Sequence, residues 1–285
     1  MRSLTSPRQL KDLLARHGFN FSKSLGQNFL VDQNILNKII EGARINKDDL
    51  VLEVGPGAGT LTRALASQAK KVAAVEIDKR LIPILDETLK DFDNVDLIQA
   101  DILKLDIQGL VDDVFDGQSF KLVANLPYYI TTPIIMRFLE EGLPFKSIVV
   151  MVQKEVAERM MASKGTKDYG SLTVAVQYYT QPRLITRVPA SVFIPPPKVD
   201  SIVLALDKRD KPPVEVKDQA AFFALVKAVF SQRRKTLLNT IHASGICDLE
   251  KDKLRLLLEG LGIDPSRRGE TLSIEDMAKI ANALF

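Results

Sequence analysis

The sequence has no tryptophan, one cysteine and two histidines among its 285 residues. Because Cys247 stands alone, an intramolecular disulfide is impossible, and a cysteine-rich zinc site lacks ligands. No apolar run approaches the roughly 18 residues of a membrane span, and no apolar segment follows the basic residues at the N-terminus. We therefore expect a cytoplasmic protein that has no metal site and no membrane contact. His17 and His242 lie far apart in the sequence, and we interpret them as surface or helix-end residues.

Charge is distributed unevenly, although the net charge is only +3. Residues 1–47 hold eight basic and three acidic residues, whereas residues 48–120 hold seven basic and fifteen acidic ones. The remaining sequence is mildly basic. Such asymmetry can mark a face that binds an anion such as nucleic acid, and it can equally be a set of solvated surface charges. Composition alone leaves nucleic-acid binding open.

Short apolar runs alternate with amphipathic segments over the first 160 residues. This alternation is typical of a parallel, doubly wound α/β sheet. Asp32 is the expected N-cap of a helix with an apolar stripe, and Thr132 that of another. We expect strands at residues 50–54, 72–77, 95–99, 121–125 and 148–152, with further helices at 7–17, 61–69, 79–89, 133–140 and 154–161.

The later part of the sequence predicts a change of architecture. Two strand-like stretches, 172–179 and 201–206, could pair antiparallel at the sheet edge, and the charged stretch 207–217 contains two prolines and resembles a linker. Helical periodicity follows, and Ser273 with Asp276 predicts a capping box. We expect helices at 222–230, 235–241, 253–258 and 274–284. The predicted domains are therefore residues 1–208, with an N-terminal helical extension, and residues 217–285.

A glycine-rich loop, Gly55-Pro56-Gly57-Ala58-Gly59, joins the predicted strand 50–54 to the next helix. Glycines at such a turn let the backbone bend sharply and let a ligand approach closely. A dinucleotide site would place its third glycine at position 60, where this chain has Thr60. The spacing therefore favours another adenosyl cofactor over NAD, although the loop alone could be a simple tight turn.

Two acidic residues follow neighbouring predicted strands. Glu76 lies near the end of the second strand, and its carboxylate can accept hydrogen bonds from both hydroxyls of a ribose. Asp101 follows the third strand and can accept from the amine of an adenine ring. Ligands of open α/β sheets bind outside the carboxyl ends of the strands, where both residues are expected. Either residue alone could be a solvated acid, but together with the loop they predict a cofactor site.

The motif Asn125-Leu126-Pro127-Tyr128 follows the fourth predicted strand, and it resembles the signature of methyltransferases that act on exocyclic amines. The side-chain oxygen of Asn125 and the carbonyl of Leu126 or Pro127 can accept the two hydrogens of the amine. That contact frees the nitrogen lone pair for an in-line attack, so most of the catalysis would be positioning and electrostatics. Tyr128 can stack on the target ring.

Five stretches together resemble the ribosomal RNA adenine dimethyltransferases, in the order in which that family carries them. The resemblance implies a Rossmann-like class I methyltransferase sheet with a small C-terminal all-helical domain. The stretches are KSLGQNFL at 23–30, EVGPGAGTLT at 53–62, DYGSL at 168–172, FIPPPKVDS at 193–201 and FSQRRK at 230–235.

The resemblance also implies the site residues. The cofactor, S-adenosylmethionine, would contact Asn28, Leu30, Gly55, Gly57, Gly59, Glu76, Asp101 and Asn125. Catalysis would use Asn125, Leu126, Pro127, Tyr128 and Phe193, with Phe193 opposite Tyr128 on the target adenine. In the last stretch, Arg233, Arg234 and Lys235 are candidates for contact with RNA phosphates.

The small-subunit branch of this family dimethylates two adjacent adenosines in the 3′-terminal hairpin loop of small-subunit rRNA. The resemblance therefore implies this rRNA, within a pre-ribosomal 30S particle, as the partner of a monomeric enzyme of ribosome biogenesis. Three alternatives remain. They are a large-subunit rRNA adenine dimethyltransferase that confers macrolide resistance, an assembly factor that acts mainly by binding, and a nicotinamide oxidoreductase, which the glycine spacing disfavours.

Overall fold

The computed structural model describes residues 4–22 and 25–285, so Lys23 and Ser24 of the predicted N-terminal motif lie outside the described residues. The chain divides into two compact units. The first contains Met1–Ala157 and Gln181–Lys208, and the second contains Glu158–Thr180 and Arg209–Phe285. Residues 158–180 therefore belong to the second unit, although they fall within the range that the sequence predicts for the first domain.

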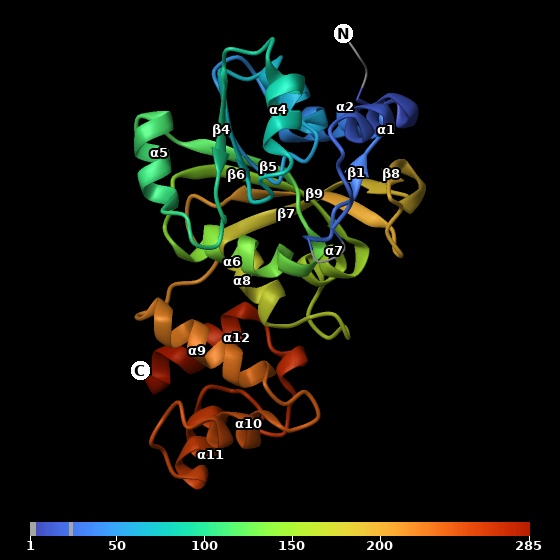
Figure 1. Cartoon of the computed structure of the whole chain (residues 1–285). Coiled ribbons are helices and arrows are strands. Elements are labelled where there is room, and N and C mark those ends of the chain that lie inside the picture. The colour runs from blue at the N-terminus through green and yellow to red at the C-terminus, as the bar shows by residue number, and fades with distance from the viewer. Residues whose placement is uncertain (1–3, 23–24) are drawn as a thin grey trace. The chain divides into compact units, whose positions relative to one another are not determined.

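The first unit contains a seven-stranded sheet with the strand order β4-β3-β2-β5-β6-β9-β7. The first five of these strands are parallel, and β9 runs antiparallel to β6. Figure 1 shows α4 and α6 on opposite sides of this sheet, as expected for a Rossmann-like α/β fold. The strands are β2 (Leu50–Val54), β3 (Lys71–Glu76), β4 (Val95–Gln99), β5 (Phe120–Asn125), β6 (Phe145–Gln153), β7 (Thr180–Val188) and β9 (Ser201–Lys208).

The helices of this region agree with most of the predicted ranges. The side chain of Asp32 accepts a hydrogen bond from the Ile35 amide, which confirms it as an N-cap. The helix α5 has no counterpart among the predictions, and the residue at the N-cap of α6 is Ile130 instead of Thr132. The bounds are α1 (Pro7–Arg16), α2 (Gln33–Ala43), α3 (Thr60–Ala66), α4 (Ile82–Leu89), α5 (Ile107–Phe115), α6 (Thr131–Glu140) and α7 (Lys154–Met161).

The order of the strands reverses between β2 and β5. From β2 the chain proceeds through β3 to β4 on one side, whereas β5 leads to β6 on the other. The helices that leave β2 and β5 therefore diverge, and a crevice opens at the carboxyl ends of these two strands. A separate two-stranded ribbon pairs β1 (Phe29–Leu30) with β8 (Phe193–Ile194).

The prediction of a strand at 172–179 is wrong. This stretch forms the helix α8 (Ser171–Tyr179), and the edge strand is the following segment, β7. Five apolar side chains of α8, from Leu172 to Tyr178, are buried. A helix that is buried on several sides has no polar face, so its sequence lacks the 3.6-residue period that would distinguish it from a strand. The strand 201–206 is confirmed as part of β9, where it pairs antiparallel with β6.

The second unit contains the C-terminal helices, drawn in orange and red in Figure 1. Ser273 and Asp276 form the predicted capping box, with the Asp276 amide donating to the Ser273 hydroxyl. Aromatic packing inside the unit joins Tyr178 of α8 to Phe222 and Phe223, with ring centroids 5.3 and 5.2 Å apart. The helices are α9 (Gln219–Phe230), α10 (Leu237–Ser244), α11 (Lys251–Gly260) and α12 (Ile274–Leu284).

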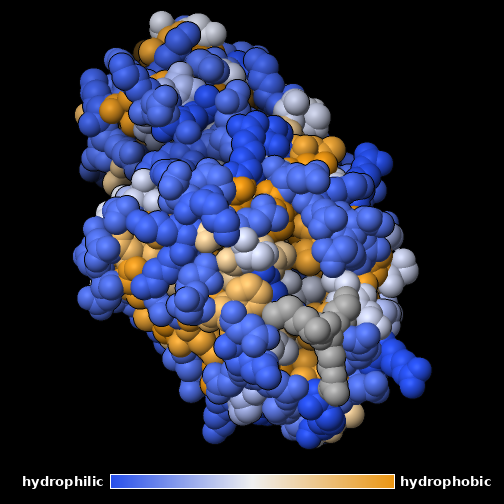
Figure 2. All heavy atoms as spheres, turned by 90° about the horizontal axis from the view of Figure 1, so that it is seen from above, coloured by the Kyte–Doolittle hydropathy of each residue, from blue (hydrophilic) through white to orange (hydrophobic). Residues whose placement is uncertain are grey.

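One face of the molecule is mostly polar. Figure 2 shows a face on which hydrophilic residues predominate and hydrophobic ones form small groups. Within the described part of the chain, no helix is both long enough and apolar enough to cross a membrane. The Arg233 guanidinium donates to the carbonyls of Lys167 and Tyr169, so it ties two loops of the second unit together. The neighbouring side chains of Arg234 and Lys235 are exposed.

Candidate active site

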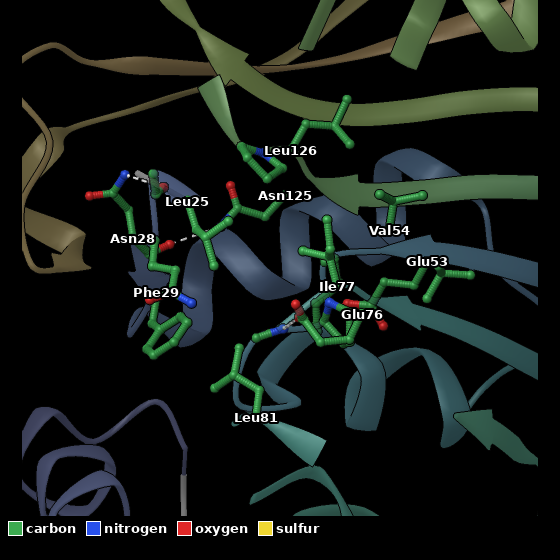
Figure 3. A pocket seen from close by; sticks show the side chains of 18 of the residues that line it. Leu25, Asn28, Phe29, Glu53, Val54, Glu76, Ile77, Leu81, Asn125 and Leu126 are labelled. Carbon is green, nitrogen blue, oxygen red and sulfur yellow. Dashed lines mark hydrogen bonds between the residues drawn. The ribbon is translucent and has the colours of Figure 1, made fainter. Parts of the chain in front are cut away.

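A cavity lies at the carboxyl ends of β2, β3 and β5, which is where an open α/β sheet binds its ligands. Residues far apart in the sequence meet there, and all of them belong to the first unit. Figure 3 shows Asn28 and Asn125 toward one side of the cavity and Glu53 and Glu76 toward the other. The lining residues are 25–30, Ile39, 53–58, 60–61, 75–77, Leu81, 100–102 and 125–130.

The glycine-rich loop forms part of the wall. Gly57 has a φ of +62°, and a Cβ at this position would lie 2.9 Å from the ring of Phe29. Glycine is therefore required both by the backbone conformation and by the close approach of the N-terminal segment. Gly59 does not line the cavity. It is the N-cap of α3, and a Cβ there would meet Thr88 at 2.9 Å.

Glu76 ends β3, and its carboxyl group faces the cavity although the residue is only 4% exposed. Its oxygens accept from the backbone amides of Gly57, at 3.3 Å, and Asp78, at 2.8 Å. Burial raises the pKa of Glu76 to about 6, and the hydrogen bonds from backbone amides partly oppose this effect. The group is therefore mostly ionised at neutral pH, and each oxygen keeps a lone pair for a further donor.

Glu53 is a second buried carboxyl group at the same cavity, and it is absent from the residues that the sequence predicts for the site. It is 1% exposed, and its Oε2 atom has no hydrogen-bond partner among the described residues. Burial raises the pKa of Glu53 to about 8. A usable signal was present in the sequence, since Glu53 is the one charged residue in the apolar strand Leu50–Val54.

Asp101 lies beyond the end of β4 and also lines the cavity. Its side chain accepts a hydrogen bond from the Leu103 amide at 3.0 Å. The neighbouring lining residues Ile77 and Tyr129 are apolar or aromatic, and they are 45% and 53% exposed, respectively. This part of the cavity therefore combines an acidic acceptor with an exposed apolar surface, as recognition of an adenine ring requires. The sequence predictions for the site include neither Ile77 nor Tyr129.

Asn125 ends β5, and its Nδ2 atom donates to the carbonyl of Asn28 at 3.1 Å (dashed in Figure 3). With the amino end of the amide engaged in this way, the Oδ1 atom is left as an acceptor. The backbone carbonyl groups of Leu126 and Pro127 differ in whether they already accept hydrogen bonds. That of Pro127 already accepts from the Thr131 hydroxyl, at 3.0 Å, and from the Ile130 amide, at 3.2 Å. The acceptor that remains beside Asn125 is therefore the carbonyl of Leu126.

Tyr128 begins a short 3-10 helix, η2 (Tyr128–Ile130), and its side chain is half-buried at the cavity wall. Its hydroxyl is 2.6 Å from the Ser201 hydroxyl of β9. Burial raises the pKa of Tyr128, and the hydrogen bond with Ser201 opposes that shift. The phenol is therefore neutral at physiological pH and its ring is held at a fixed position.

Among the predicted catalytic residues, Phe193 is the one that the structure does not place at the cavity. It is 2% exposed, belongs to the apolar core and pairs with Leu30 across the β1–β8 ribbon. It is not among the residues that line the cavity. Its proposed contact with a target base stays a prediction. The predicted residues that do line the cavity are Asn28, Leu30, Gly55, Gly57, Glu76, Asp101, Asn125, Leu126, Pro127 and Tyr128.

Comparison with known proteins identifies the family. Ribosomal RNA small subunit methyltransferase A of Alkaliphilus oremlandii is 54% identical over 284 residues, which cover 100% of this chain and 99% of that protein. The crystal structure of a dimethyladenosine transferase from Plasmodium falciparum has a TM-score of 0.73 at 30% identity, covering 88% of this chain and 95% of that one.

A second solved structure, the 23S rRNA methyltransferase ErmE, has a TM-score of 0.67 at 28% identity, covering 90% of this chain and 99% of that one. The sequence profile of the ribosomal RNA adenine dimethylase family matches residues 18–284, nearly the whole chain. A cavity bordered by Asn125–Tyr128 and by the glycine loop agrees with that match. This chain belongs to the ribosomal RNA adenine dimethylase family.

Proposed function

We propose that this chain transfers methyl groups from S-adenosylmethionine to the exocyclic amines of two adjacent adenosines in the 3′-terminal hairpin loop of small-subunit rRNA. The products are dimethyladenosines, and the reaction belongs to ribosome biogenesis in the cytoplasm. The proposal is supported by a relative named small subunit methyltransferase A that matches over the full length. We propose a monomeric enzyme that acts on a pre-ribosomal 30S particle.

The cavity suits the proposed cofactor because its donors and acceptors match the parts of that molecule. The carboxylate of Glu76 would accept from the ribose hydroxyls, and Asp101 would accept from the adenine amine beside Ile77. The unpartnered Oε2 atom of Glu53 lies in the cavity wall and would accept from the ammonium group of the methionine part. Burial favours the protonated form of Glu53, and a cationic group bound beside it would favour the ionised form and donate to its unpartnered Oε2 atom.

When bound, the cofactor supplies an activated methyl group on a sulfonium centre, and this chain supplies the geometry for its transfer. The target amine is a weak nucleophile because its lone pair is delocalised into the adenine ring. Asn125 Oδ1 and the carbonyl of Leu126 would accept its two hydrogens and orient the lone pair. No strong base is needed, so positioning and electrostatics account for most of the catalysis.

Tyr128 would hold the target base by one face after the base leaves its stack. Leaving the stack costs a few kcal/mol, and stacking on an aromatic side chain returns about 1–3 kcal/mol. The hydrogen bond of the Tyr128 hydroxyl with Ser201 fixes the ring in advance, so less entropy is lost on binding. We propose Phe193 as the second stacking partner, which requires the ring to emerge from its present buried position.

The single observation that carries this proposal is the bond between Asn125 and Asn28, because it leaves Asn125 Oδ1 as an acceptor beside the carbonyl of Leu126. The test is to incubate the protein and tritiated S-adenosylmethionine with small ribosomal subunits that lack the modification. Primer extension should then stop at two adjacent adenosines near the 3′ end. Label that enters other nucleotides of the small-subunit RNA would disprove the assignment.

Large ribosomal subunits are the matched control, because a solved relative is named as a 23S rRNA methyltransferase. Methylation of large-subunit RNA in their presence would favour the macrolide-resistance alternative. An assembly factor that acts mainly by binding would associate with small subunits and leave them unmethylated. Sedimentation after the labelled reaction measures how much protein is bound to the small subunits, and the label measures methylation. Binding without label identifies an assembly factor.

A further inference from the structure

The N-terminal segment 25–30 is attached to the rest of the first unit at both of its ends. All six residues line the cavity. At the C-terminal end, Leu30 pairs with Phe193 in the β1–β8 ribbon. Toward the N-terminal end, the side chain of Gln27 donates to Asp78 at 2.8 Å and accepts from the Ser22 amide at 2.8 Å. The Gln27–Asp78 bond therefore connects this segment to the loop after β3.

Asp78 is the centre of this attachment. Its side chain is only 4% exposed, and its carboxylate accepts from Gln27 and pairs with the Arg80 guanidinium at 2.6 Å. Hydrogen bonding from Arg80 is the main cause that lowers the pKa of Asp78, so the acceptor stays ionised. The backbone amide of Asp78 in turn donates to Glu76 at 2.8 Å. One residue thus contacts both the N-terminal segment and the proposed ribose acceptor.

The same segment also reaches the residue that is proposed to orient the target amine. Directly after Gln27, the carbonyl of Asn28 accepts from Asn125 Nδ2 at 3.1 Å. Contacts therefore link Glu76 to Asn125 in series. The Asp78 amide bonds to Glu76, the Asp78 carboxylate bonds to the Gln27 side chain, and the backbone from Gln27 to Asn28 leads to the bond with Asn125. The two halves of the site, one for the cofactor and one for the base, are linked through an element that lies outside the sheet.

We propose that Gln27 and Asp78 form a latch that holds segment 25–30 in place and thereby orients Asn125, which makes Gln27 a positioning residue for methyl transfer. The inference rests on the proposed function. An amide side chain has a donor end and an acceptor end, and only the acceptor end can bind the amine. Without the carbonyl of Asn28, the amide of Asn125 is free to rotate and present its NH₂ group to the amine, and two donors do not bond.

The test compares the purified full-length protein with Gln27→Met, which keeps the length of the side chain and removes its hydrogen bonds. At saturating S-adenosylmethionine, kcat for methylation of small subunits should fall about tenfold or more, since small misplacements of reacting groups reduce rates steeply. The dissociation constant for S-adenosylmethionine, measured by calorimetry, should change much less than kcat, because Leu30 stays paired with Phe193 and Glu76 keeps both of its backbone hydrogen bonds.

A second variant and a control complete the test. Asp78→Leu, which keeps a side chain of similar shape and removes both oxygen acceptors, should reduce kcat in the same way. The double variant should be no worse than the more impaired single variant, since both changes break the Gln27–Asp78 bond. The control is Glu87→Gln, which weakens the ion pairs of Glu87 with Arg16 and His17. These residues lie at the end of α1, away from segment 25–30. The kcat of this control should match the wild type.

Three results would overturn the latch. The first is an unchanged kcat in Gln27→Met at full occupancy by the cofactor. The second is a loss of activity in Gln27→Met that comes from weaker binding of S-adenosylmethionine and disappears at saturating cofactor. The third is an equal loss of kcat in Glu87→Gln, which would indicate a general loosening of the N-terminal region. Melting temperatures of all variants identify a loss that comes from unfolding. If Gln27→Met unfolds, Asp78→Leu decides the question. If the wild-type protein does not methylate small subunits, the proposed function fails independently of the latch.

Discussion

Glu53 and Glu76 are buried carboxyl groups on the neighbouring strands β2 and β3, and they face the same cavity. Burial raises the pKa of Glu53 to about 8 and that of Glu76 to about 6, and the negative charge of Glu76 adds to the shift of Glu53. At neutral pH one group is mostly protonated and the other mostly ionised. Their different charge states lead to separate predictions for stability and for cofactor binding.

Glu53→Gln should flatten the dependence of stability on pH. The folded-state pKa of Glu53 is raised above its ordinary value of 4.5, so the folded protein binds the extra proton and loses stability as pH rises from about 5 to about 8. The slope from one such group is at most about 1.4 kcal/mol per pH unit. Urea denaturation at pH 5 and pH 8 measures it, and a variant with the wild-type slope would show that Glu53 does not titrate in this range.

Glu76→Ala should weaken the binding of S-adenosylmethionine, because the ribose hydroxyls lose a charged acceptor. Hydrogen bonds to charged groups contribute about 1.5–3 kcal/mol, so the affinity should fall roughly 10- to 100-fold. In the wild type the affinity should also decline below the pKa of about 6, as the carboxylate becomes protonated. Calorimetry of Glu76→Gln should show no such decline, and unchanged affinity in both variants would remove Glu76 from the site.

Asn125→Ala should abolish most turnover and leave RNA binding intact. The change removes the acceptor that orients the amine, whereas most RNA affinity comes from phosphate contacts elsewhere. Single-turnover methylation measures the first effect, and co-sedimentation with small subunits measures the second. Asn125→Asp is a useful companion, because it keeps an oxygen acceptor and loses the donor that bonds to Asn28. Normal turnover with lost RNA binding would contradict the assigned role.

Phe193→Leu tests whether the buried ring takes part in the reaction. After one transfer the amine keeps a single hydrogen, so the second transfer depends more on stacking of the base. If the ring of Phe193 supplies that stacking, monomethyladenosine should accumulate, and mass spectrometry of digested RNA reads this product directly. Leucine keeps most of the apolar volume in the core, which limits the loss of stability. An unchanged product ratio with a lower melting temperature would mean that Phe193 acts only in the core.

Local patterns in the sequence were sufficient for the parallel sheet and for the position of the cavity. Strands β2 and β4 have the predicted bounds, and β3 and β5 differ by one residue at one or both ends. These elements were predictable because fully buried parallel strands are short apolar runs bounded by turn residues. The cavity lies where the rule places it, at the carboxyl ends of such strands, and Glu76, Asp101 and Asn125 line it.

Tertiary structure decided what local patterns do not encode. The sequence of α8 resembles that of a strand, because a helix buried on several sides is apolar all round and lacks helical periodicity. Phe193 lies in the core because β8 pairs with β1. Gln27 and Asp78 are separated by 51 residues, and no spacing rule predicts their bond. The sequence alone determined which chemical groups this protein has at the ends of its strands. Only the folded chain decided which of them meet, because contacts between distant segments depend on packing and not on local periodicity.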